Sequence, residues 1–106
     1  MDAEALFDEI AAELVPLGAA TGAMFGARSL KLGGKVFATT NKGRITVKLK
    51  AGEPDHVRAL EVGTPFDPSG KGRPMKDWVS LGDASLSDDV VSGFVRAAFE
   101  RMRGGA

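Results

Sequence analysis

The chain has 106 residues, 43% hydrophobic and 26% charged, which is enough for one domain with one core and too apolar for a disordered chain. It contains no cysteine, which excludes disulfides, thiolate metal sites and a cysteine nucleophile. The N-terminus is acidic, and no apolar run approaches the ~20 residues of a membrane span. We therefore expect a bacterial cytoplasmic protein with no membrane contact.

The formal net charge is zero, but the charges are unevenly distributed. Residues 28–76 contain eleven Lys and Arg against four Asp and Glu, whereas residues 1–27 contain five acidic residues and no basic one. Such asymmetry predicts a surface region of positive potential contributed by the middle of the chain.

The first predicted element is an amphipathic helix over residues 3–15, with Asp2 as its N-cap and Pro16 and Gly18 ending it. Its apolar residues recur at steps of three and four, which places them on one helical face. These inner residues are Ala3, Leu6, Phe7, Ile10, Ala11 and Leu14.

Strand signals follow. Residues 19–27 are small and Gly-rich, and they indicate a loop or a short strand with Met24 and Phe25 pointing inward. Gly33-Gly34 and Asn41-Lys42-Gly43 favour tight turns between strands at 29–32, 35–40 and 44–50. The last of these alternates strictly, so one face must be core and the other exposed. Ile45, Val47 and Leu49 share the inner face, and Arg44, Thr46, Lys48 and Lys50 share the outer one.

In the second half, Pro54 suits the first turn of a short helix that ends at Gly63, with Val57 and Leu60 facing inward. The Pro- and Gly-rich residues 64–76 predict a loop, and residues 78–81 predict a strand.

A last helix is predicted after Ser85 or Ser87 as N-cap, with Asp88 and Asp89 in its first turn. Its predicted inner stripe consists of Val91, Phe94, Val95, Ala98 and Met102.

This order predicts an α+β fold in a single domain over residues 1–106. One antiparallel sheet is flanked by helices, in the order helix, two or three strands, helix, one or two strands, helix.

Residues capable of catalysis are scarce. His56 is the only imidazole, and we interpret it as an exposed helix histidine rather than a general base. Asp88 and Asp89 are explained by the helix dipole and the cap. No cluster of ligands has metal-binding spacing, so we expect neither an enzyme nor a cofactor or metal.

Two features permit a binding interpretation. In Ser69-Gly70-Lys71-Gly72-Arg73, glycines between cations either serve a solvated turn or present backbone N–H groups to an anion. Trp78 beside this loop is either a core residue, as we expect, or a base-stacking platform.

Several segments carry a family resemblance: Met24-Phe25-Gly26, Gly34-Lys35-Val36-Phe37-Ala38, Val47-Lys48-Leu49, Pro65-Phe66-Asp67-Pro68, Gly72-Arg73-Pro74-Met75-Lys76 and Trp78-Val79. In this order, over residues 20–82, they resemble the N-terminal domain of the TfoX/Sxy family and the related YjbR/MmcQ group. The resemblance implies a secretion-chaperone-like order of helix, three strands, helix, two strands, helix. Full-length TfoX/Sxy proteins, regulators of natural competence, carry a further C-terminal helical domain. The 106 residues leave no room for that domain, so we expect a stand-alone domain here. For YjbR-like proteins, DNA binding has been suggested.

We therefore expect a non-enzymatic regulatory or adaptor domain that contacts an unidentified protein partner. The alternative is a weak DNA-binding module insensitive to sequence, although the zero net charge argues against a dedicated one. The protein contact would use the outer sheet face and the 64–76 loop, and DNA binding would use the same face and the 70–76 loop. The candidate contact residues are Lys31, Arg44, Lys48, Lys50, Lys71, Arg73 and Lys76.

Overall fold

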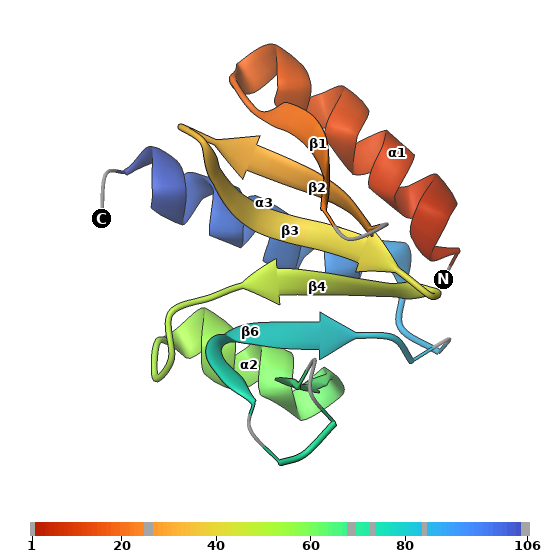
Figure 1. The fold of residues 1–106 in the computed structure, drawn as a ribbon, viewed down its shortest axis with the longest axis vertical. Helices are drawn as coiled ribbons and strands as arrows, with labels where there is room; N and C mark the ends of the chain where they lie inside the picture. The colour runs from red at the N-terminus through yellow and green to blue at the C-terminus, as the bar shows by residue number, and fades with distance from the viewer. Residues whose placement is uncertain (1, 25–26, 68–69, 73, 84, 105–106) are drawn as a thin grey trace.

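The computed structural model of the protein describes residues 2–24, 27–67, 70–72, 74–83 and 85–104 (Figure 1). The helices within these ranges are α1 (Ala3–Leu14), the 3-10 helix η1 (Val15–Leu17), α2 (Pro54–Val62) and α3 (Asp88–Arg103). The strands are β1 (Ala20–Met24), β2 (Ala27–Leu32), β3 (Lys35–Asn41), β4 (Arg44–Lys48), β5 (Thr64–Phe66) and β6 (Met75–Leu81). Across the described ranges, no helix has the length and hydropathy of a transmembrane segment.

The strands form one antiparallel sheet in the order β1-β2-β3-β4-β6-β5, which confirms the α+β class with flanking helices. Four strands precede α2, more than the two or three predicted, because residues 20–24 pair along their whole length with β2. The predicted 64–76 loop also contains a strand, β5, because residues 64–66 pair with β6.

Small side chains suit the edge strand β1. A Cβ at position 22 would lie 3.0 Å from Cε of Lys31 and 3.1 Å from Oγ of Ser29. Gly22 thus lets the Lys31 side chain lie across the neighbouring strand. The predicted inward orientation of Met24 and Phe25 concerns side chains outside the described part of the structure.

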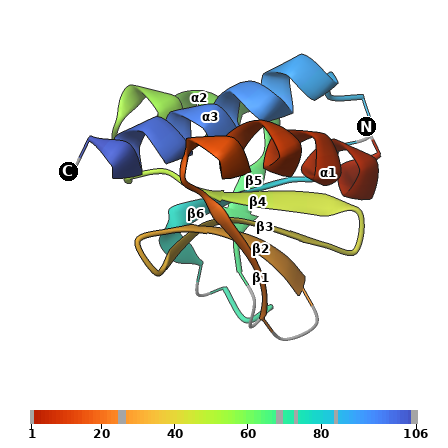
Figure 2. The ribbon, with the colours of Figure 1, turned by 90° about the horizontal axis from the view of Figure 1, so that it is seen from above.

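All three α-helices lie on one face of the sheet (Figure 2). The inner side of β4 is as predicted, since Ile45, Val47 and the following Leu49 are buried in the core. The prediction that its other side is exposed is wrong at Thr46, which is 6% exposed. The opposite face, called the outer face below, has no helix over it (Figure 2).

Helix α1 confirms its prediction. The Asp2 carboxylate accepts a hydrogen bond from the Ala5 N–H at 3.2 Å, and all six predicted inner residues are buried. Pro16 lies in η1, and Gly18 ends it with a φ of 116°, a left-handed conformation that favours glycine.

Helix α2 contradicts one prediction, because Val57 is 49% exposed whereas Ala59 is fully buried. A Cβ at Gly63 would lie 2.6 Å from the Ser80 carbonyl oxygen, so the helix approaches β6 through its smallest residues. Ala59 lies one turn before Gly63, and Val57 lies about 200° from Ala59 around the axis. Leu60 is partly buried, as a flanking position should be.

Helix α3 begins at the predicted cap, where Ser87 Oγ accepts a hydrogen bond from the Val90 N–H at 3.2 Å. Within the predicted stripe, Val91, Val95 and Ala98 are buried, while Phe94 and Met102 are only partly buried. The prediction missed Phe99, which is fully buried with its ring centroid 5.6 Å from that of Phe37.

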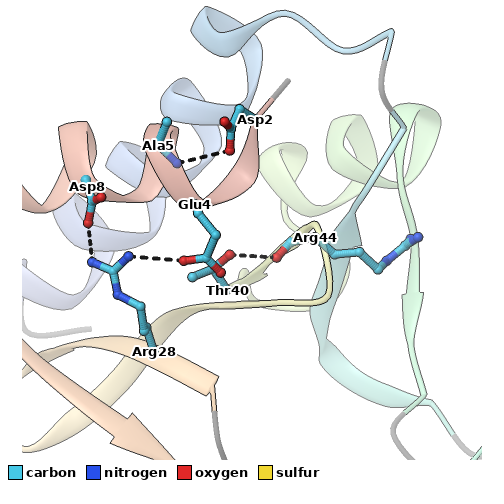
Figure 3. Close-up of polar contacts among 7 residues, drawn as sticks. All are labelled: Asp2, Glu4, Ala5, Asp8, Arg28, Thr40 and Arg44. Carbon is cyan, nitrogen blue, oxygen red and sulfur yellow. Dashed lines mark hydrogen bonds and ion pairs between the residues drawn. The ribbon is translucent and has the colours of Figure 1, made fainter.

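Arg28 ties the sheet to α1 (Figure 3). Its guanidinium forms ion pairs with Glu4, at 3.1 Å, and with Asp8, and it lies 5.1 Å from the centroid of the Phe7 ring. The hydrogen bond to Asp8, followed by that to Glu4, raises the pKa of Arg28. This cation of the middle segment therefore serves the fold and is not available to a partner.

A second ion pair joins α1 to α3 and predicts an acid-dependent loss of stability. Arg96 Nε and Nη2 donate to the Glu13 carboxylate at 2.6 and 2.8 Å, and these bonds hold the pKa of Glu13 below its ordinary value of 4.5. The folded state therefore gains stability above the unfolded pKa and loses it as the pH falls through the folded pKa. We expect Glu13→Gln to lower the free energy of unfolding by about 0.2–1 kcal/mol at pH 7, because the pair is exposed. This difference should vanish in acid, as measured by urea denaturation across pH 2–7.

The matched control is Glu9→Gln, on the same helix. Glu9 has no ion pair with any described residue, so its neutral variant should show no comparable pH-dependent difference. Equal pH profiles for the two variants would contradict the assignment to the Glu13–Arg96 pair.

Candidate functional site

Three of the predicted contact residues lie on the outer face. In the sheet, Lys48 pairs with Trp78 and Lys31 pairs with Ala20. The adjacent pairs of the register point toward the helices, so these two lysines point to the outer face. Arg44 shares the face of Thr46 and Lys48, as the alternation predicts. The outer face is thus basic, but its cations do not all lie beside one another.

Arg44 is already engaged. Its Nε donates to Ser80 Oγ at 2.7 Å and its Nη2 to Thr64 Oγ1 at 3.3 Å, so the side chain reaches across β6 to β5. Figure 3 shows this side chain directed away from Arg28. A Cβ at Gly82 would lie 2.5 Å from Cζ of Arg44, so Gly82 provides the space for this path. Arg44 therefore links β4, β6 and β5 on the outer face, and its guanidinium is already bound to neighbouring side chains.

Short side chains form a row across the outer face, one from each strand. The register aligns Gly22, Ser29, Thr39, Thr46, Ser80 and Thr64. Ser29, Thr46 and Ser80 are only 0%, 6% and 5% exposed although no helix covers them, and Ser29 Oγ has no hydrogen-bond partner among the described residues. A partner docking here would touch the longer side chains on either side of this row.

Trp78 is among these longer side chains. We predicted that it belongs to the core, but it pairs with Lys48 on the outer face and is half-buried. Its ring centroid lies 6.5 Å from that of Phe66, also half-buried, which joins β6 to β5. The two rings form an aromatic patch beside Lys48.

Both glycines of the loop at residues 69–73 use their N–H groups within the chain. The N–H groups of Gly70 and Gly72 donate to the Asp67 carboxylate at 3.1 and 2.8 Å. The loop's own carboxylate thus occupies the position expected for an external anion. Lys71 and Lys76 are exposed, and Arg73 lies outside the described residues.

Two of the predicted contact residues, Lys48 and Lys50, lie beside the same cavity. They line a hollow of about 260 Å³ at the end of the sheet where β3 begins, β4 ends and the last turn of α3 passes (Figure 1). The other lining residues are Lys35, Asp77, Arg101 and Met102. Four cations and one carboxylate make this a positively charged cavity, called the lysine hollow below.

Sequence reasoning missed Lys35 and Arg101 as members of this site. The turn at Asn41-Lys42-Gly43 was a usable signal for Lys35, because it joins β3 and β4 in a hairpin and so brings the start of β3 near the end of β4. No such signal exists for Arg101, because its position depends on how α3 docks on the sheet.

The residues considered for catalysis lie at positions that the fold explains. His56 Nε2 lies 2.9 Å from the Lys76 carbonyl oxygen, and Asp88 and Asp89 lie in the first turn of α3. Among the residues that the structure describes, no three His, Asp or Glu lie close enough to hold a metal ion.

Neither a protein-family model nor any curated protein or solved structure matches this chain. The resemblance to the TfoX/Sxy family therefore stays a prediction carried by the quoted residues.

Proposed function

We propose that this chain is a non-enzymatic regulatory or adaptor domain that contacts a protein partner through its outer face. One observation carries the proposal: all three α-helices pack on one face of the sheet, and the other face has an aromatic patch among lysines. Protein interfaces are enriched in aromatic residues at their centre and are polar at their rim.

The chemistry of the outer face indicates an acidic partner. Lys31 and Lys48 lie on it, and Lys76 is exposed two positions before Trp78 in β6. Complementary charge at the rim speeds association and selects the partner. The TfoX/Sxy resemblance supports a regulatory role of the same kind, in the cytoplasm.

The alternative, a weak DNA-binding module, has less support. Arg44 is bound to Ser80 and Thr64, and the N–H groups of Gly70 and Gly72 are bound to Asp67. Fewer groups are then left to neutralise a row of phosphates than the sequence suggested.

The test is a quantitative affinity capture from a cytosolic extract of the source organism at 150 mM NaCl, with and without nuclease, and repeated at 50 and 200 mM salt. We expect the double variant Lys31→Glu/Lys76→Glu to lose at least about tenfold in retention of any specific partner, because both charges face an acidic surface. Neither residue lines the lysine hollow, so this result reports on the outer face alone.

The matched control is Lys42→Glu/Arg103→Glu, which changes the net charge equally in the β3–β4 turn and at the end of α3. The control should retain the partner. Equal loss in both double variants would contradict an outer-face contact. Retention that disappears with nuclease and falls steeply between 50 and 200 mM salt would instead favour DNA.

A further inference from the structure

The lysine hollow combines residues that the fold holds in place with charges that it leaves free. Asp77 Oδ1 accepts a hydrogen bond from the Ala51 N–H at 2.9 Å, and the Asp77 carbonyl oxygen accepts one from the Leu49 N–H at 2.8 Å. These bonds fix the chain on both sides of Lys50. Arg101 is held by an ion pair with Glu53 at 3.4 Å. Asp77 and Arg101 therefore form a fixed frame for the hollow.

The three lysines of the hollow are not neutralised. Lys35, Lys48 and Lys50 come from β3, β4 and the segment after β4, and none has an ion pair with a described residue. Like charges around one cavity repel one another, and a bound anion would relieve that repulsion. The carboxylate of Asp77 is partly satisfied by the Ala51 N–H, so it offsets only part of the positive charge.

The shape of the hollow limits the ligand. Its volume of about 260 Å³ is just below the range of sites that take drug-sized molecules, about 300–1,000 Å³. Met102 contributes an apolar wall beside the cations. A ligand that fits both features has a compact polyanionic group and a small non-ionic part.

We propose that the lysine hollow binds the phosphate groups of a small phosphorylated molecule through Lys35, Lys48 and Lys50. Arg101, whose charge is already paired with Glu53, lines the same cavity from α3, and Met102 contacts the rest of the ligand. A nucleic acid fits less well, because the cations converge on a cavity, whereas a duplex backbone needs a row of cations on an open surface. Lys48 borders both this site and the outer face, but the test of the outer-face contact changes only Lys31 and Lys76, so either proposal can fail without the other.

The experiment is a titration of the full chain, followed by amide NMR, with inorganic phosphate, pyrophosphate and tripolyphosphate at constant ionic strength. We expect saturable shifts centred on Lys35, residues 48–51 and Arg101. Affinity should rise at least about tenfold from phosphate to pyrophosphate, because a second charged group gains its own charge-assisted hydrogen bonds. Binding should also raise the melting temperature.

The variant Lys48→Gln/Lys50→Gln should weaken pyrophosphate binding at least about tenfold. Lys42→Gln, an exposed lysine in the β3–β4 turn at the opposite end of the sheet, is the control and should change it less than about twofold. Shifts that do not saturate, or equal weakening by the control, would overturn the proposal. So would saturable binding of a short DNA duplex without binding of pyrophosphate, which would assign the hollow to nucleic acid.

Discussion

Replacing Phe99 by alanine is expected to lower the free energy of unfolding by about 3–5 kcal/mol, as measured by urea denaturation. Phe99 is fully buried, and its ring lies 5.6 Å from that of Phe37, so it joins α3 to the sheet at the centre of the core. The loss combines the transfer of a large apolar side chain with the cavity that it leaves. Since domains of this size have about 5–15 kcal/mol in total, the variant should be marginal.

Phe94→Ala provides the control on the same helix. Phe94 is only partly buried, so removing the same atoms should cost less than half as much. Phe99→Leu, which fills most of the space, should remain folded and lose less than Phe99→Ala. If Phe94→Ala proves as costly as Phe99→Ala, the assignment of Phe99 as the central contact of α3 is wrong.

Gly63→Ala is expected to cost about 3 kcal/mol, at the upper end of the range for overpacked sites. The new Cβ would lie 2.6 Å from the Ser80 carbonyl oxygen and 2.8 Å from Leu81 Cδ2. Because the nearest atom belongs to the backbone of β6, the C-terminal end of α2 would have to move away from the sheet. The φ of −130° at Gly63 suits any residue, so the cost arises from contact and not from backbone strain.

Gly93→Ala should have the opposite sign. Gly93 lies inside α3, and a Cβ there would meet nothing within 4 Å. Alanine is favoured over glycine in a helix interior, so this variant should gain about 0.5–1 kcal/mol. Thermal and urea unfolding of the two variants side by side give the comparison. A loss at both positions would indicate that glycine is needed for a reason other than the close approach to β6.

Local patterns in the sequence accounted for α1, the inner side of β4 and the N-caps of α1 and α3. In these segments, periodicity and cap chemistry act within one element, so neighbouring residues decide the outcome. For α2, the pattern failed to identify the face that meets the sheet. Val57 has the apolar character of a core residue but is exposed, because the close approach at Gly63 sets which face of α2 meets the sheet.

The candidate site divides in the same way. Alternation along β4 placed Arg44 and Lys48 on the outer face, and composition located the cations in residues 28–76. Only the tertiary structure showed that Ser80 and Thr64 engage Arg44, and that the lysine hollow includes Arg101 from α3. Side-chain direction within a strand is fixed by its period of two, which the sequence contains. Which charges meet depends on strand order and helix docking, which arise from packing between segments far apart in the chain.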